Sequence, residues 1–513
     1  EGFTGEVKKY TYDDIRVYSN TIAKFLQDKG VNVGDRVCLF MDKVPELYIG
    51  FIGVLKMGGI TQPLFSAFGE EALFTRLDDA KTRAIIIQKK HLPKVRRIKD
   101  KLPDLTKIIV IDADEAATPQ INEIHFWMEK APKVEKFDIV KVGPEVPSVI
   151  HYTSGTTGKP KGAQHAHSSI IAQYITSKWV LDLQSDDIYW CTADPGWVTG
   201  TSYGIIGPWA LGVTQVVLDA GFGAEKWYAF MQKYKVSMWY SAPTAIRLLM
   251  KEGIEAVKKY DLSTLRHLAS VGEPLNAEAV VWSEKAFGKM FHDTYWQTET
   301  GAMMITNYPG MKIKPGSMGK PFPGITATVL NTKTYEPITS AGIVGLIALK
   351  PGWPSMMRSY WNNKTTYDSK FKNGWYICGD RASIDSEGYF WFVGRDDDVI
   401  NTAGHLVGPF EIESALLEHK AVAESAAVGK PDPVNMEVVK AFIALKPGFE
   451  PSGDMELDIM NFIRKKLSPL AMPQEIEFVP SLPKTRSGKI MRRLLRAKEW
   501  GEEIGDTSTL END

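Results

Sequence analysis

Apolar and polar residues alternate along the first 300 residues in two patterns, amphipathic runs of helical period and short apolar runs. The spacing predicts a helix over 12–29 and a strand over 36–41. The same patterns predict further helices at 46–57, 167–180 and 224–234, and strands at 84–88, 107–111, 214–217 and 237–240. Helices that alternate with buried strands indicate βαβ units, so we expect an α/β fold with two similar α/β layers.

The pattern changes after residue 324. Short β runs such as 326–330 and 345–349 are separated by Gly and Pro, which predicts a small β subdomain. The acidic segment 395–398 then precedes a stretch with its own predicted elements, which are helices at 409–417 and 456–466, strands at 423–428 and 440–445, and a basic end at 484–496. We expect a large domain over 1–394, a hinge at 395–398 and a small, mobile α+β domain over 399–513.

The longest uncharged stretch, 195–218, has the length of a membrane span. Glycines at 196, 200, 204, 207 and 212, with a proline at 208, interrupt it repeatedly. We therefore expect buried loops and strands there.

Composition narrows the class of protein. The chain has 513 residues, 61 Lys and Arg, 62 Asp and Glu, and 44% hydrophobic residues, which is typical of a globular protein and excludes disorder, collagen and a small disulfide scaffold. The balanced charge gives no general attraction to nucleic acid or anionic membrane, so we expect neither as a partner. Any anion must be bound by a local site.

Cys38, Cys191 and Cys378 lie far apart without C-x-x-C spacing, which argues against disulfides and a zinc site and favours a reducing compartment, the cytoplasm. The chain begins at Glu1 rather than Met, so we expect a missing N-terminal segment, and targeting to an organelle stays open. The sequence leaves a monomer and a homodimer as alternatives.

The most informative segment is YTSGTTGKPKG at 152–162. Its glycines let backbone N–H groups approach a ligand closely, its hydroxyls can donate hydrogen bonds, and its lysines add positive charge. It differs from a Walker A loop in its glycine spacing and in Pro160. It predicts a polyphosphate site, with a surface loop as the alternative, over residues Thr153, Ser154, Gly155, Thr156, Thr157, Gly158 and Lys159.

At this point the chain resembles the acyl-adenylate-forming (AMP-binding) enzymes, which include acyl-CoA synthetases. Five further segments match in the family's order, and they are SVGEP (270–274), HDTYWQTETG (292–301), GWYICGD (374–380), GRDDD (394–398) and PKTRSGK (483–489). The resemblance implies ATP, Mg²⁺ and CoA as cofactor and co-substrates. A carboxylate and ATP would give acyl-AMP, and a thiol would then take the acyl group.

The resemblance also implies roles for single residues. Lys489 would bridge the carboxylate and the α-phosphate, with a solvated basic tail as the alternative. Thr298 and Glu299 would be catalytic, with Glu299 holding Mg²⁺ or, alternatively, serving as a helix N-terminal charge. Asp380 would bind the ribose beside Arg395, unless they are a turn residue and a surface ion pair. The other matched nucleotide residues are Gly272, Glu273, Pro274, Asp293, Thr294, Tyr295, Trp296 and Gln297.

For the second step, Asp397 matches the family's hinge, about which the small domain would rotate. Thr199, Ala403 and Gly404 would line the path of CoA. Arg464 would bind the 3′-phosphate, although its position near a helix end also suits the helix dipole. Acylation of Lys489 would remove its charge and stop adenylation.

The acid to be activated depends on five predicted pocket residues, Trp197, Val198, Thr199, Val271 and Trp296. In the subset that resembles acetyl-CoA synthetases, a tryptophan before QTETG closes the acyl pocket, whereas medium-chain enzymes have glycine there. Trp296 therefore predicts a short acid, acetate or propionate, with C4 and small branched acids left open. Its alternative role is a core aromatic beside the nucleotide.

One departure from the family is Leu406, where an arginine is expected, with His405 as a neighbouring substitute cation. Because of this substitution, two alternatives to the forward reaction stay open, the reverse, ATP-forming direction and a non-catalytic protein that binds a nucleotide or acyl-adenylate. A medium-chain synthetase also stays an alternative. His419 is a weak candidate metal ligand. The leading expectation is an AMP-forming acid–thiol ligase for short-chain acids.

Overall fold

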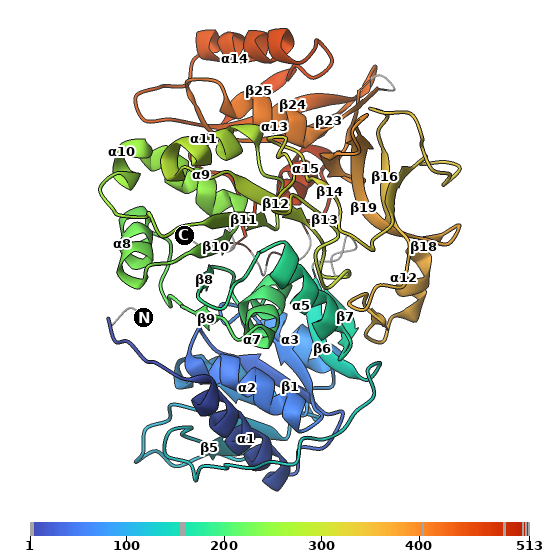
Figure 1. Ribbon diagram of the computed structural model, residues 1–513. Coiled ribbons are helices and arrows are strands. Elements are labelled where there is room, and N and C mark those ends of the chain that lie inside the picture. The colour runs from blue at the N-terminus through green and yellow to red at the C-terminus, as the bar shows by residue number, and fades with distance from the viewer. Residues whose placement is uncertain are drawn as a thin grey trace.

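The computed structural model describes residues 5–153, 160–402, 405–485, 489–504, 507 and 510. The described residues form four β-sheets, and the N-terminal sheet lies at the bottom of Figure 1. Its strand order is β17-β7-β6-β2-β1-β3-β4-β5, parallel from β6 to β5 and antiparallel at β6-β7-β17. The strands are β1 (Arg36–Phe40), β2 (Ile60–Pro63), β3 (Ala84–Ile87), β4 (Lys107–Val110), β5 (Glu123–His125), β6 (Pro147–Thr153), β7 (Lys161–Ala166) and β17 (Ser359–Tyr360).

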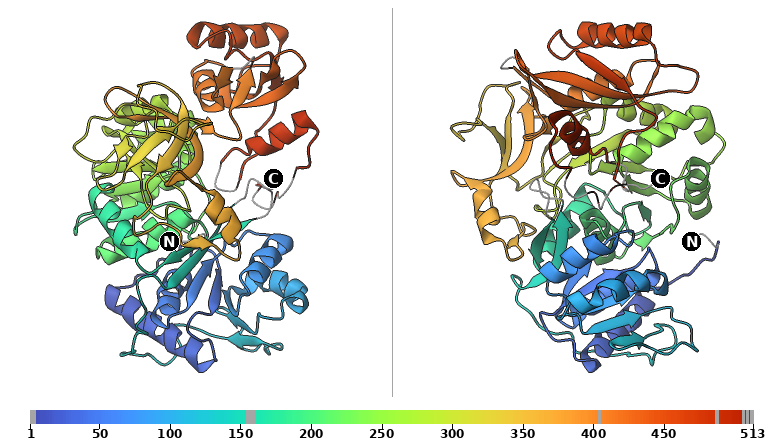
Figure 2. Two further views of the ribbon diagram at one scale, coloured as in Figure 1. Left: turned by 90° about the vertical axis from the view of Figure 1, so that its right-hand side faces the viewer. Right: turned by 180° about the vertical axis from the view of Figure 1, so that it is seen from behind.

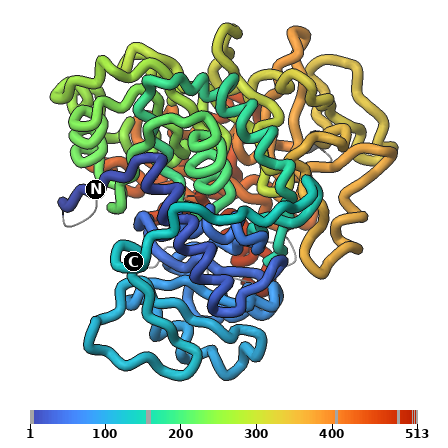
Figure 3. Tube along the Cα trace, turned by 60° about the horizontal axis from the view of Figure 1, so that its bottom comes forward, coloured from blue at the N-terminus to red at the C-terminus, as the bar shows by residue number. Residues whose placement is uncertain are grey.

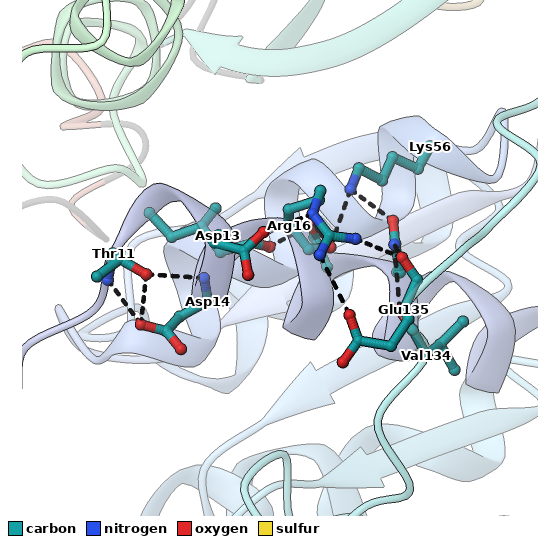
Figure 4. Close-up of polar contacts among 10 residues, drawn as sticks. Thr11, Asp13, Asp14, Arg16, Lys56, Val134 and Glu135 are labelled. Atoms are coloured by element: carbon teal, nitrogen blue, oxygen red, sulfur yellow. Dashed lines mark hydrogen bonds and ion pairs between the residues drawn. The ribbon is translucent and has the colours of Figure 1, made fainter.

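Helices pack on this sheet, and they are α1 (Tyr12–Asp28), α2 (Pro45–Lys56), α3 (Glu70–Asp79) and α4 (Leu92–Ile98). Helices α1 and α2 lie side by side, in dark blue and blue in Figure 3. Thr11 starts α1 with a capping box, since its hydroxyl accepts the Asp14 N–H at 3.1 Å and the Asp14 carboxylate accepts the Thr11 N–H at 2.8 Å. Lys56 on α2 donates to the Arg16 carbonyl at 3.1 Å, which ties the two helices together (Figure 4).

The second layer has the strand order β14-β13-β12-β11-β10-β8-β9, with β9, β8, β10, β11 and β12 parallel. Its strands are β8 (Ile188–Cys191), β9 (Thr214–Gln215), β10 (Met238–Ser241), β11 (His267–Val271), β12 (Phe291–Tyr295), β13 (Ile305–Thr306) and β14 (Lys320–Pro321). Its helices are α5 (Ser169–Trp179), α8 (Ala224–Tyr234), α9 (Pro243–Glu252), α10 (Ile254–Val257) and α11 (Ala277–Phe287).

The third sheet is antiparallel and stands at the right of Figure 1. It contains β15 (Ala327–Leu330), β16 (Gly345–Leu349), β18 (Phe371–Lys372), β19 (Trp375–Ile384) and β20 (Phe390–Arg395), with helix α12 (Lys364–Ser369) beside it. The fourth sheet, at the top, contains β21 (Ile400–Thr402), β22 (His405–Val407), β23 (Val422–Asp432), β24 (Met436–Leu445) and β25 (Glu475–Phe478). Its helices are α13 (Pro409–Leu417), α14 (Gly453–Lys466) and α15 (Arg492–Trp500), the last of which lies below the sheet in Figure 2.

The predicted α/β class with two α/β layers, a β subdomain and a smaller C-terminal α+β part is confirmed. The prediction of loops and strands over 195–218 was wrong for 198–210, which is helical, whereas β9 does lie in the remainder of that stretch. The helical part forms α6 (Val198–Thr201), a π-helical turn (Ser202–Ile206) and α7 (Gly207–Ala210), buried between the two layers. Among the described residues, no helix is both long and apolar enough to cross a membrane.

The glycines that suggested loops instead allow close helix packing. A Cβ on Gly200 would lie 2.2 Å from the Asp194 carbonyl oxygen, and one on Gly207 would lie 2.0 Å from Ser177 Oγ on α5. Only glycine fits at these two positions, against a backbone oxygen at Gly200 and a side-chain oxygen at Gly207. The cost of glycine in a helix is offset by the packing of neighbours such as Tyr203, which is fully buried.

We expect Gly200→Ala to lower the melting temperature, because the new methyl group meets backbone and forces the helix to move. Overpacking of this kind costs about 1–3 kcal/mol in the free energy of unfolding. Gly204→Ala is the matched control in the same helical segment, since its Cβ would meet Cys191 Sγ at an ordinary 3.8 Å. Equal melting temperatures for the two variants, measured by calorimetry, would contradict the packing explanation.

Candidate functional site

A buried carboxylate lies where the second and third sheets meet. Asp380 on β19 is 9% exposed, and its Oδ2 accepts hydrogen bonds from the Tyr295 hydroxyl and Gln297 Nε2, both at 2.7 Å. Gln297 Nε2 also donates to the Cys378 carbonyl at 2.9 Å. Burial raises the pKa of Asp380 above its usual value, while the Tyr295 hydrogen bond opposes the shift.

Arg395 pairs with Asp380 in the register of β19 and β20. Its Nε donates to Asp397 Oδ1 at 3.0 Å. Burial lowers the pKa of Arg395, but the charges of Asp397 and Asp380 outweigh that effect and the net shift is upward. The two predicted ribose residues are therefore brought together at one edge of the third sheet.

Lys489 comes to this region from the C-terminal part of the chain. Its side chain is accessible to solvent, yet protein groups crowd around it and lower its pKa. The positive charge of Arg395 lowers that pKa further, whereas Glu273 and Asp380 oppose the shift. Four residues from segments far apart in sequence thus act on one another electrostatically.

Glu273 belongs to the second layer and is held firmly. Its carboxylate accepts from the Thr244 hydroxyl at 2.7 Å and from Arg247 at 2.6 Å. Arg247 also donates to Asn276 Oδ1 at 3.3 Å, and Asn276 Nδ2 donates to Ser414 Oγ on α13 at 2.7 Å. This chain of contacts links the predicted adenine segment to the C-terminal part.

The other matched residues of the second layer lie on β12 and in the turn that follows the neighbouring strand β11. Asp293 on β12 accepts from Ser270 Oγ at 2.7 Å, and burial raises the pKa of Asp293 to about 7. Thr294 donates from Oγ1 to the Ser270 carbonyl at 2.7 Å. Gly272, next to Glu273 and Pro274, has φ of +96°, which suits glycine in that turn.

The segment with Thr298 and Glu299 is held by side chains from the N-terminal sheet, Tyr360 on β17 and His165 on β7. The Tyr360 hydroxyl donates to Glu299 Oε1 at 2.8 Å, and buried His165 contacts the Thr298 carbonyl through Nε2 at 2.8 Å. Within the described part of the chain, no group of three His, Cys, Asp or Glu residues is arranged to hold a metal. A lone carboxylate next to a threonine hydroxyl fits Mg²⁺ that takes its remaining ligands from phosphate and water.

Three of the five predicted pocket residues, Trp296, Val271 and Val198, lie together in one hydrophobic cluster. Trp296 is 8% exposed, donates from Nε1 to the Tyr240 hydroxyl at 3.2 Å and meets the Tyr203 ring edge to face with centroids 5.1 Å apart. Val271 and Val198 belong to the same hydrophobic cluster. Trp197 packs elsewhere, on Phe65 and Phe68, with ring centroids 5.7 and 6.4 Å away. Thr199 lies beside it in α6.

Two further candidates lie far from this group. His419 Nε2 lies 3.3 Å from Asp458 and its ring packs on Phe462, an arrangement that gives it one acidic neighbour and does not support metal binding. Arg464 is exposed in the last turn of α14, where its charge suits the helix dipole.

Several predicted residues lie outside the described part of the chain, namely Ser154, Gly155, Thr156, Thr157, Gly158, Lys159, Ala403 and Gly404. Thr153 ends β6, so the predicted phosphate segment joins β6 to β7. The backbone of His405 and Leu406 lies in β22.

Sequence reasoning missed the residues that support the site. Tyr360, His165, Tyr240 and Tyr203 orient predicted residues, yet each lies 50 or more positions away from its partner in the chain. No local pattern marks them, since their role depends on contacts between layers.

Comparison with known proteins identifies the family of this chain. The model of the AMP-binding enzyme family matches residues 2–361, and that of the AMP-binding enzyme C-terminal domain matches residues 411–489. The chain is 49% identical to an acetyl-coenzyme A synthetase of Bacillus subtilis over 98% of this chain and 88% of that protein. It is 39% identical to an acetyl-coenzyme A synthetase of Pyrobaculum aerophilum over 100% of this chain and 80% of that protein.

Two solved structures have the same fold. A Brucella canis acyl-CoA synthetase aligns with a TM-score of 0.74 and 33% identity over 97% of this chain and 90% of its own. An anthranilate CoA ligase in complex with anthranoyl-AMP aligns with a TM-score of 0.86 and 29% identity over 96% of this chain and 92% of its own. The predicted resemblance is confirmed, and the chain belongs to the AMP-binding enzyme family.

Proposed function

We propose that this protein is an AMP-forming acyl-CoA synthetase that activates a short-chain carboxylate, acetate first, and transfers the acyl group to CoA. The observation that carries the proposal is the buried Asp380 carboxylate, held by Tyr295 and Gln297 beside Arg395. The charges of Glu273 and Lys489 also act on this region. Fixed acids and cations arranged in this way suit a site for a nucleotide and a carboxylate. The acetyl-coenzyme A synthetase relatives supply the reaction class.

In the first step, a carboxylate oxygen forms a bond to the α-phosphorus of ATP and pyrophosphate leaves. No proton has to move, so the protein contributes alignment and charge neutralisation. Lys489 would bridge the two reacting anions, and Asp380 would accept hydrogen bonds from the ribose hydroxyls beside Arg395. Mg²⁺ held by Glu299 would neutralise charge on the phosphates, and the Thr298 hydroxyl would donate to the same oxygens.

The rest of the nucleotide site is proposed from the matched segments. Gly272, Glu273 and Pro274 would contact the adenine, and 293–297 would follow the α-phosphate and ribose. The hydroxyls and amides of 153–159 would hold the β- and γ-phosphates, as their composition favours.

In the second step, the CoA thiol loses its proton to solvent, its sulfur forms a bond to the acyl carbon, the C–O bond to the phosphate breaks and AMP leaves. Asp397 is proposed as the hinge between domains 1–394 and 399–513, with Thr199, Ala403 and Gly404 on the thiol path and Arg464 on the CoA phosphate. The Arg395 contact to Asp397 would have to change when the hinge rotates.

The preference for short acids rests on Trp296. Its indole contacts Tyr240 and Tyr203 in a cluster with Val271 and Val198, and these contacts oppose a rotation that would admit a longer chain. A medium-chain synthetase is the alternative within the family. The Leu406 substitution keeps the ATP-forming direction open as well.

The cellular compartment of the enzyme is also part of the proposal. Cys38, Cys191 and Cys378 are buried and free, which supports a reducing compartment such as the cytoplasm. Acylation of Lys489 stays a prediction to be checked by mass spectrometry of the native protein.

The purified enzyme should form AMP from ATP and Mg²⁺ only when CoA and a short acid are both present. Straight-chain acids from acetate to octanoate, tested with coupled AMP detection, should give a maximum at C2 to C4. A maximum at C6 to C8 would keep the ligase and refute the short pocket, whereas absence of AMP with every acid would favour the non-catalytic binder.

Lys489→Ala should reduce acetate-dependent exchange of pyrophosphate into ATP about 100- to 1,000-fold, because a charge at the reacting oxygens is removed. Thioester formation from supplied acetyl-AMP and CoA should continue at nearly the wild-type rate. Full exchange activity in this variant would exclude Lys489 from the adenylation step.

Trp296→Gly should move the optimum acid from C2 or C3 toward C6 to C8, since removal of the indole opens the end of the cluster and each buried CH₂ gains about 0.8 kcal/mol. The matched control is Trp179→Ala, an indole that is 54% exposed on α5. Specificity constants, kcat/KM, across the acid series provide the readout. An unchanged profile in Trp296→Gly would refute its role as the pocket wall.

A further inference from the structure

Lys489 stands on a tight hairpin whose described parts are 483–485 and 489–491. The Thr485 N–H donates to the Lys489 carbonyl at 2.8 Å, and the Lys489 N–H donates to Thr485 Oγ1 at 3.1 Å. The Met491 N–H donates to the Pro483 carbonyl at 2.8 Å, one step further from the tip. Such a hairpin fixes its own shape but not its direction relative to the sheet that carries it.

Each arm of this hairpin ends in an ion pair to a neighbouring element. On the outgoing arm, Arg492 donates from Nε to Glu413 Oε1 at 2.6 Å, and a second guanidinium nitrogen bonds Glu413 Oε2. On the incoming arm, Lys484 Nζ donates to Glu424 Oε1 on β23 at 2.5 Å. The two anchors lie on either side of Lys489, five residues before it and three after it.

The Arg492 pair is the stronger anchor. Glu413 on α13 is 4% exposed, and its carboxylate also accepts the Ala427 N–H of β23 at 2.9 Å. A two-point guanidinium contact to a carboxylate that is itself fixed restricts both the position and the angle of the chain. By contrast, Arg496 on α15 contacts Glu502 at 3.5 Å with the carboxylate 51% exposed, which constrains little.

The Arg492–Glu413 pair also lies close to the predicted hinge segment 395–398. Helix α13 follows β22 and the hinge residues along the chain, and Asp398 lies close enough to Arg492 and Lys489 for both charges to lower its pKa against the effect of burial. Buried ion pairs add little stability over an apolar pair of equal volume, so the geometry of this pair bears on the direction of the chain more than on its stability.

We propose that the Arg492–Glu413 pair, assisted by Lys484–Glu424, is a clamp that aims Lys489 into the adenylation site. Arg492 and Glu413 are positioning residues that act through Lys489 and touch no substrate. The clamp holds the hairpin at a fixed angle to α13, so that the Lys489 ammonium reaches the site of Asp380 and Glu273. The inference rests on the proposed function, because it names what sets the geometry of the first half-reaction.

The test measures the two half-reactions separately in the full-length protein. Arg492→Gln should lower acetate-dependent pyrophosphate exchange about 100-fold, the loss that a misplacement of about 1 Å can cause. Thioester formation from supplied acetyl-AMP and CoA should stay at the wild-type rate. Arg492→Lys, which keeps the charge but loses the fork, should give an intermediate loss of exchange. Arg496→Gln is the matched control and should keep both rates.

A second measurement asks whether the effect passes through Lys489. In single turnover with excess enzyme, Arg492→Gln should cause no further loss of adenylation in a Lys489→Ala background. Independent, multiplying losses there would overturn the clamp. So would wild-type exchange in Arg492→Gln, or a parallel fall of both half-reactions together with the melting temperature. If the wild type itself shows no acetate-dependent pyrophosphate exchange, the proposed function is refuted, and the inference, which rests on it, is refuted as well.

Discussion

The buried carboxylate of Asp380 is the point on which the arrangement of the molecule depends. A carboxylate that leaves water costs several kcal/mol unless donors and cations replace the lost hydration. Here the donors come from the second sheet, through Tyr295 and Gln297, while the acid itself belongs to the third sheet. Arg395 faces it across β19 and β20, and Lys489 approaches from the C-terminal part. Hydrogen bonding of this one anion therefore joins the second and third sheets, and the charge of Lys489 acts on it from the C-terminal part.

The close packing between the two α/β layers also depends on contacts between distant parts of the chain. The helical segment 198–210 fills the space between them, and Gly200 permits a backbone contact, to the Asp194 carbonyl, that any side chain would block. Local reasoning assigned the glycines of this segment to loops, because glycine usually weakens a helix. The tertiary contact decides the outcome, since a buried helix such as this one is stabilised by its neighbours rather than by its own propensity.

The sequence predicted most helices and strands well, because their period follows from which face is buried; the helix at Ala224–Tyr234 and the strand at Gly345–Leu349 have the expected bounds. It also pointed to Asp380, Arg395, Glu273 and Lys489 through short motifs. The supporting contacts could not be predicted. Glu413 and Arg492 are 79 positions apart, and a single sequence carries no signal that joins one acid to one particular arginine among many.

The charge on Lys489 shows how the site is prepared for its substrates. Crowding by protein and the positive charges of Arg395 and Arg492 lower its pKa. A nucleotide and a carboxylate bring negative charge to the same region, which shifts the pKa of Lys489 upward. Binding of the anions and protonation of Lys489 are therefore linked, and each favours the other by the same free energy.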